Sequence, residues 1–197
     1  MFKRRIPLMS AAFLLVSMLA SQRVAYPSSE AEWTLVAPPD EGFSVRMPVK
    51  PADETDRVPM LGNTYLMRMY SSVDEPTGMV YMVVMQEVSS VAGALEPSKR
   101  IEQFMKGFQE GMAKSMANVK LEITPDRDLD LKGHFGRQYK LAVADSRGVV
   151  RAFDATTRVY VLVALGGDER KSGVRLFLDS FEITPAPAPV PKPIPSN

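Results

Sequence analysis

Apolar and polar residues alternate along most of the chain between residues 33 and 165, which is the period of half-buried β-strands. Met79–Met85 differs because it is apolar throughout, and we expect a central strand that is covered on both faces. Short turns such as Asp145–Gly148 favour antiparallel hairpins. The predicted strands are Trp33–Ala37, Phe43–Met47, Thr64–Tyr70, Met79–Met85, Lys120–Ile123, Phe135–Ala144, Val149–Ala155 and Arg158–Ala164.

Two segments have helical spacing instead. The first is Pro97–Asn118, whose apolar stripe contains Phe104 and Phe108, and we expect these two side chains to press on the strand Met79–Met85. The second follows Gly166-Gly167, with Asp168 as the expected N-cap. Its predicted buried stripe is Val174, Phe177, Leu178 and Phe181. Strands in consecutive runs with few helices predict an α+β fold with a mostly antiparallel central sheet.

The N-terminus has the pattern of a secretory signal peptide. Lys3, Arg4 and Arg5 precede the apolar run Ile6–Ala20, and small residues follow it. This fifteen-residue run falls short of the roughly 20 residues that span a bilayer, so an uncleaved anchor is the weaker alternative. We expect residues 1–25 to be removed near Ala20 to Ala25, which predicts a periplasmic or secreted protein.

The C-terminus changes composition at Pro185. Proline alternates with small or apolar residues through Pro195, which prevents both helix and sheet pairing. We expect residues 185–197 to be a disordered, proline-rich tail that acts as a spacer or as a docking peptide. Residues 26–184 are then predicted to form a single domain.

Charge and cysteine content exclude several classes of function. Without residues 1–25, 20 Lys and Arg stand against 23 Asp and Glu, a net charge of −3. A mildly acidic chain with mixed charges gives no reason to expect nucleic-acid binding. The absence of cysteine removes disulfides, thiolate metal sites and thiol nucleophiles. Contact with a membrane is expected only through the signal peptide during export.

Several short phrases carry a resemblance to a known family. They are Trp33, Gly42-Phe-Ser-Val45 ending at Pro48, Gly133-His-Phe-Gly-Arg137, Arg158-Val-Tyr-Val-Leu162 and Phe177-Leu-Asp-Ser-Phe181. With the leader and the midchain helix, they resemble the PsbP-like domain of exported bacterial envelope proteins. The resemblance implies a central antiparallel sheet flanked by two amphipathic helices, an α/β/α sandwich. It also implies a non-catalytic accessory or assembly role. Residues 21–32 lack a counterpart to the partner-binding N-terminal extension of the photosystem proteins, so a photosynthetic role does not follow.

The candidate metal sites are weak. His134 is the only histidine and lies between Gly133 and Gly136, so we expect an exposed turn residue rather than a general base. Asp126, Asp128 and Asp130 superficially match a calcium loop. The sixth position of that loop is Leu131 rather than glycine, and the twelfth is Arg137 rather than glutamate. We expect strand alternation instead, with Leu129 and Leu131 inward and the three carboxylates in water.

Other candidate groups have plain structural explanations. The pairs Asp53/Glu54 and Asp74/Glu75 stand beside prolines in expected loops, where nothing separates their pKa values for acid–base work. Ten methionines follow the signal, which makes a copper carrier conceivable. They interleave with valine and aromatic residues, however, as core filler does.

No catalytic, cofactor-binding or metal-ligating residue is therefore assigned. The leading hypothesis is an exported, non-catalytic accessory or binding domain of the cell envelope, with an envelope protein as partner. One alternative is a carrier of a small apolar ligand between the helix Pro97–Asn118 and the sheet. A weaker alternative is a hydrolase with an unrecognised site.

Overall fold

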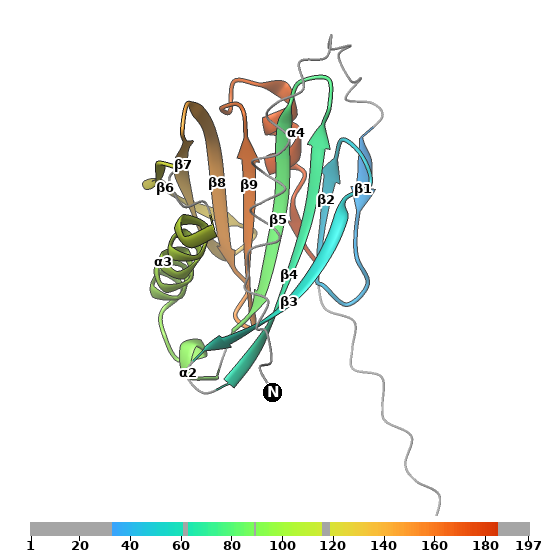
Figure 1. Cartoon of the computed structure of the whole chain (residues 1–197). Helices are drawn as coiled ribbons and strands as arrows, with labels where there is room; N and C mark the ends of the chain where they lie inside the picture. Colours follow the sequence, from blue (N-terminus) through green and yellow to red (C-terminus); the bar gives the residue numbers. More distant parts are fainter. Residues whose placement is uncertain (1–32, 61–62, 89, 116–118, 185–197) are drawn as a thin grey trace, which may run out of the picture.

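A large antiparallel sheet and a small one form the framework of the computed structural model (Figure 1). It describes residues 33–184, apart from 61–62, 89 and 116–118. The strands are β1 (Thr34–Val36), β2 (Phe43–Met47), β3 (Ala52–Met60), β4 (Asn63–Asp74), β5 (Met79–Glu87), β6 (Leu121–Leu131), β7 (His134–Val143), β8 (Ser146–Asp154), β9 (Arg158–Leu165) and β10 (Glu182–Ile183). The helices are α2 (Ser90–Gly93), α3 (Pro97–Ser115) and α4 (Ser172–Asp179).

The large sheet joins two meanders. Its strand order is β3-β4-β5-β9-β8-β7-β6, and every neighbouring pair is antiparallel. Hairpins connect β3 to β5 and β6 to β9, and the pairing of β5 with β9 joins the two halves. The small sheet has the order β1-β2-β10. These pairings confirm the prediction of an α+β fold with mostly antiparallel sheets.

Different layers cover the two faces of the large sheet. On one face, α4 and the small sheet share a core with β5 and β9, built around Tyr81, Tyr160, Phe43, Phe177 and Phe181. On the other face, α3 buries Ile101 and Met105 against β7, β8 and β9. The central strand β5 supplies both cores, as its continuous apolar sequence predicts. The layer opposite α3 is thus a helix together with a small sheet, rather than a helix alone.

The placement of α3 adds to one prediction. The main contacts of α3 with the sheet lie on β6, β7, β8 and β9. Phe104 and Phe108 pack against a core cluster that also contains Met82 and Val84 of β5, the strand on which they were expected to press. Phe104 and Phe108 stack on each other, 6.3 Å between ring centroids, and are only half-buried, while Ile101 is fully buried. Helical periodicity identifies the apolar face of a helix but not the strands it meets. The predicted end at Asn118 falls outside the described residues.

A buried ion pair fixes the start of α3. The Arg100 guanidinium donates from Nε and Nη2 to the two carboxylate oxygens of Asp154, at 2.7 and 2.5 Å. Arg100 also donates to the Gly93 carbonyl at 3.1 Å and to the Leu95 carbonyl, so it anchors the α2–α3 connection as well. Both side chains are less than a tenth exposed, and their bidentate geometry offsets the cost of burying the charges.

The start of α4 corrects one prediction. Its N-cap is Lys171, which makes no side-chain cap bond, and Asp168 lies in the preceding turn. There Asp168 accepts a hydrogen bond from the Arg170 backbone N–H at 3.0 Å and pairs with the Arg170 side chain. The predicted stripe is confirmed: Val174, Phe177 and Leu178 are buried on α4, and Phe181 is buried just beyond it.

Candidate functional site

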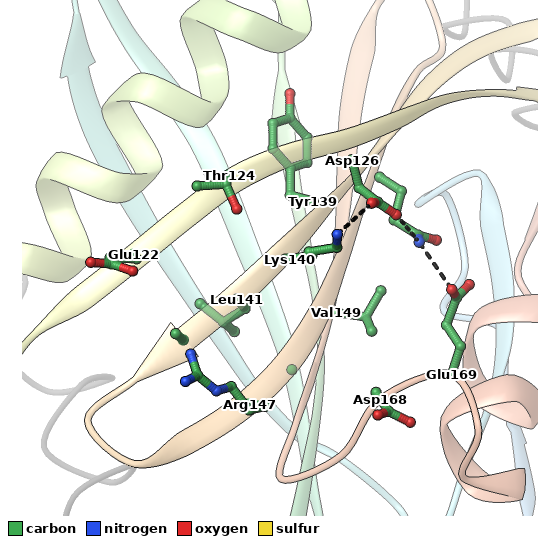
Figure 2. Close-up of a pocket in the computed structure, with 13 residues that line it drawn as sticks. Glu122, Thr124, Asp126, Tyr139, Lys140, Leu141, Arg147, Val149, Asp168 and Glu169 are labelled. Atoms are coloured by element: carbon green, nitrogen blue, oxygen red, sulfur yellow. Dashed lines mark hydrogen bonds and ion pairs between the residues drawn. The ribbon is translucent and has the colours of Figure 1, made fainter.

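A polar pocket of ≈ 440 Å³ opens where β6, β7 and β8 meet the loop before α4 (Figure 2). β6 contributes Glu122, Thr124 and Asp126, and the loop contributes Asp168 and Glu169. The remaining lining residues are Gln138, Tyr139, Lys140, Leu141, Ala142, Arg147, Gly148 and Val149. The acids come from β6 and from the loop before α4, and the basic Lys140 and Arg147 come from β7 and β8 between them, so charges of both signs surround the pocket.

Gln138 lies at the centre of a charged network beside this pocket, formed with Asp126, Arg127, Arg151 and Glu169. Its side-chain amide donates to Asp126 Oδ2 at 3.0 Å and to Glu169 Oε2 at 3.1 Å. Its carbonyl accepts from Arg127 at 3.2 Å and from Arg151 at 3.0 Å. Both donors and both acceptor positions of this buried amide are thus engaged, and the network has no vacant position at its centre.

Strand register explains why these residues meet. Arg127 on β6 and Arg151 on β8 are both cross-strand partners of Gln138 on β7. Directly opposed residues share a face, so two cations flank one amide. Glu169 then bridges the two arginines, at 2.7 Å from Arg127 and 3.0 Å from Arg151. The network therefore ties the loop before α4 to three strands.

Both acids of the network are held in the charged form. Hydrogen bonds from Lys140 and Gln138 lower the pKa of Asp126 below its ordinary value. Burial alone would raise the pKa of Glu169, but hydrogen bonds from Arg127, Arg151 and Gln138 lower it overall. Neither carboxyl is poised to exchange a proton near neutral pH, as a general acid or base would be.

The structure separates the residues of the rejected calcium loop. Leu129 and Leu131 pack against the core and Asp128 and Asp130 are exposed, as strand alternation predicts. The side chain of Asp126 is only 20% exposed, because a bulge between Pro125 and Arg127 breaks the alternation there. Asp126 belongs to the pocket network, whereas Asp128 pairs with Arg137 at 2.6 Å. Asp130 accepts a hydrogen bond from the Gly133 backbone N–H at 3.1 Å. His134 is not a turn residue, because it opens β7 and is half-buried.

The predicted loop position is wrong for three of the four paired acids, Asp53, Glu54 and Asp74. Asp53 and Glu54 belong to β3, the edge strand of the large sheet. Asp74 ends β4, is nearly buried and accepts a hydrogen bond from the Thr77 hydroxyl at 2.6 Å. Only Glu75 of the four lies in a turn. An edge strand tolerates prolines and charged residues, which is why β3 has the composition of a loop.

A second buried acid lies away from the pocket. Glu41 follows β1, is almost fully buried and pairs with Arg68 on β4 at 2.9 Å. Its other carboxylate oxygen has no hydrogen-bond partner among the described residues. Burial raises the pKa of Glu41 above its ordinary value, and the nearby charge of Arg68 opposes that rise.

Comparison with solved structures identifies the architecture. The solution structure of cyanobacterial PsbP (CyanoP) from Synechocystis sp. PCC 6803 superposes with a TM-score of 0.51 at 13% identity, covering 84% of this chain and 98% of that one. The fold is PsbP-like. No family model matches the chain, and no curated protein matches it. At this identity the likeness establishes the PsbP-like fold and leaves function to the residues. None of the described helices is long and apolar enough to cross a membrane.

Sequence reasoning missed the Gln138 network. Gln138 and Lys140 alternate with apolar residues on β7, as solvent-facing positions of a strand do. Only the two bordering strands and the Glu169 loop together enclose the Gln138 side chain. Arg127 and Arg151 were the signal available in the sequence. Charged side chains on a strand face need opposite charges nearby, so they indicate that acids such as Glu169 lie close to them.

Proposed function

We propose that this protein is an exported, non-catalytic accessory domain that binds a protein partner in the cell envelope. The saturated network around Gln138 carries the proposal, because its acids and bases satisfy one another instead of awaiting a substrate. Such a network builds a rigid, charged surface, which suits recognition of a polar partner surface. The N-terminal leader pattern and the PsbP-like fold support export and an accessory role.

The pocket mouth is the proposed contact surface. Lys140 and Arg147 are exposed there, and Glu122, Asp168 and Glu169 line the same pocket. A rigid surface with charges of both signs selects its partner by electrostatic complementarity more than by burial of apolar surface. Lys140 is held 3.1 Å from Asp126, so one of the cations is already oriented.

The apolar-carrier alternative finds less support. The contact between α3 and the sheet is filled by packed side chains, including Ile101, Met105 and Tyr139, each less than 5% exposed. The hydrolase alternative would be favoured by an acid with a raised pKa at the pocket. Asp126, Asp168 and Glu169 instead have lowered pKa values.

Photo-crosslinking in the native envelope tests the proposed surface. A photoreactive residue replaces Arg147, and a matched control replaces Lys50, another exposed cation outside the pocket. We expect a discrete adduct from the Arg147 position and none from Lys50, with thermal melts of both proteins unchanged. Equal crosslinking at both positions, or none at either, would contradict the proposal.

A further inference from the structure

The cations at the polar pocket reach further into solvent than two of its acids. The side chain of Lys140 is 76% exposed, and that of Lys120, which pairs with the lining residue Glu122, is 79% exposed. The side chains of Asp126 and Glu169 are only 20% and 32% exposed. The pocket therefore presents positive charge outward and keeps these two carboxylates inside.

The two more exposed acids of the pocket are each held by a cation. Glu122 pairs with Lys120 at 2.9 Å, and Asp168 pairs with Arg170 at 2.6 Å. Hydrogen bonds from these cations lower the pKa of both carboxyl groups, so both stay ionised and paired near neutral pH. The acids of the pocket are thus all engaged by cations of the same chain.

Arg147 is the exception among the charges that line the pocket. It is exposed, and its side chain has no ion-pair partner among the residues that the structure describes. The pKa of Glu122 is lowered mainly by Lys120 and only to a lesser degree by the charge of Arg147, so that acid is committed elsewhere. Asp145, in the adjoining turn, is exposed but does not line the pocket. The positive charge of Arg147 is therefore available to another molecule.

Strand register places the cations on one surface. Lys140 on β7 lies opposite Val149 on β8, and Arg147 precedes Val149 by two residues. Lys140 and Arg147 are therefore diagonal neighbours on one face of the sheet, roughly 7–8 Å apart, as Figure 2 shows for the same wall of the pocket. Lys120 reaches this face too, because its partner Glu122 lines the pocket.

We propose that the surface formed by Lys120, Lys140 and Arg147, called here the cationic rim, binds a carboxylate-bearing segment of a protein partner. The inference rests on the proposed function and names the chemistry of its partner. A carboxylate matches the planar guanidinium of Arg147 in bidentate geometry, and the two lysines add attraction as mobile point charges. The pocket beside them, of ≈ 440 Å³, is large enough to admit an acidic side chain.

A hollow surface favours a protein segment over a lipid bilayer. The cationic rim borders a pocket, whereas the headgroup surface of a bilayer is flat and would meet only the exposed tips of the side chains. Surfaces that lie on membranes also insert apolar side chains beside their cations. The exposed large apolar residues of the described chain are Leu35, Val49 and Leu95, and none of them lines the pocket.

Binding of an acidic peptide tests the chemistry of the rim. The probe is a short fluorescent peptide of alternating glutamate and glycine, and fluorescence anisotropy at low salt measures its affinity for the protein purified from its native host. The test variant carries Lys120→Gln, Lys140→Gln and Arg147→Gln. The control variant carries Lys50→Gln, Lys106→Gln and Arg175→Gln, which remove the same charge from exposed positions outside the pocket.

We expect the test variant to bind the peptide at least about fivefold more weakly than the parent protein, because three exposed charge pairs are lost. The control variant should stay within about twofold of the parent protein. Added salt should reduce the difference, since it screens exposed charges. Thermal melts should show that both variants remain folded. A parent protein that does not bind the peptide, or equal weakening by the two variants, would overturn the proposal.

Vesicles of phosphatidylglycerol and phosphatidylcholine test the membrane alternative. They should bind the parent protein and the test variant equally weakly. Vesicle binding that is lost in the test variant but kept in the control variant, without binding of the peptide, would assign the rim to a lipid surface and overturn the proposal.

The crosslinking experiment separates this inference from the proposed function. With the photoreactive residue at position 147, Lys120→Gln and Lys140→Gln should together lower the adduct yield by about threefold or more at low salt. An unchanged yield would overturn the acidic partner and leave the proposed function standing. Peptide binding that depends on the cationic rim, with no adduct in the envelope, would contradict only the proposed function.

Discussion

Gln138 joins four charged side chains from two strands and one loop, so a single substitution reaches all of them. Gln138→Leu keeps the approximate size but removes every hydrogen bond of the hub, leaving partly buried charges with fewer partners. We expect a loss of about 2–4 kcal/mol in the free energy of unfolding, measured by urea denaturation. The control Gln103→Leu on the exposed face of α3 should change it by less than about 0.5 kcal/mol. Similar values for the two variants would contradict a structural hub.

Glu41 gives the fold a pH dependence of a definite sign. Its pKa in the folded protein is raised from an ordinary value of 4.5, so folding favours its protonated form. Its contribution to stability is therefore complete below pH 4.5 and is lost as the pH rises through the folded-state pKa. The substitution Glu41→Gln should remove this pH-dependent loss of stability, because the glutamine side chain does not ionise.

Thermal melts between pH 4 and 7 measure that difference. The melting temperature of Glu41→Gln relative to the parent protein should rise across the range, because only the parent must bury a carboxylate at the higher pH. A difference that falls with pH would mean that the Arg68 ion pair outweighs the cost of burial.

Among the elements, α3 offers a clear contrast between two apolar positions. Ile101 is fully buried against the sheet, whereas Phe108 is half-buried. Ile101→Ala should cost about 3 kcal/mol of unfolding free energy because it leaves a cavity. Phe108→Ala should cost about 1.5 kcal/mol, since much of that ring already meets solvent. Denaturant titration of both variants checks the order, and a larger loss at Phe108 would reverse it.

Elements with regular periodicity were predictable from sequence, and their tertiary partners were not. The alternation in Phe43–Met47 and the apolar run at Met79 correctly predict β2 and β5. β3 was missed because Pro51, Pro59 and several acids make it resemble a loop, although a strand paired on one side can carry them. The main contacts of α3, with β6, β7 and β8, were not predicted, since its apolar face fits any apolar sheet surface. The pocket network was missed because local periodicity does not reveal strand register or the position of the loop before α4. These two features bring Glu169 beside Gln138.

For the molecule as a whole, export is the prediction with the most direct test. The basic residues before Ile6–Ala20 predict removal of the leader by a signal peptidase. Intact-mass measurement of the protein from its native host should find an N-terminus between Ser21 and Tyr26. Full-length chain recovered from the cytosol would refute the assignment.

The pairing of β2 with β10 sets the order in which the domain can be completed. Phe43 lies opposite Ile183, so two strands from the extreme ends of the described chain meet in the small sheet. A polypeptide that emerges N-terminus first, from a ribosome or a membrane pore, can pair β2 with β1 early but leaves the other edge of β2 open until β10 has emerged. Contacts of such sequence separation form slowly, so the late arrival of β10 delays closure of the Phe43–Phe181 core. The connectivity thus makes closure of this core one of the last steps in folding, after β10 has emerged.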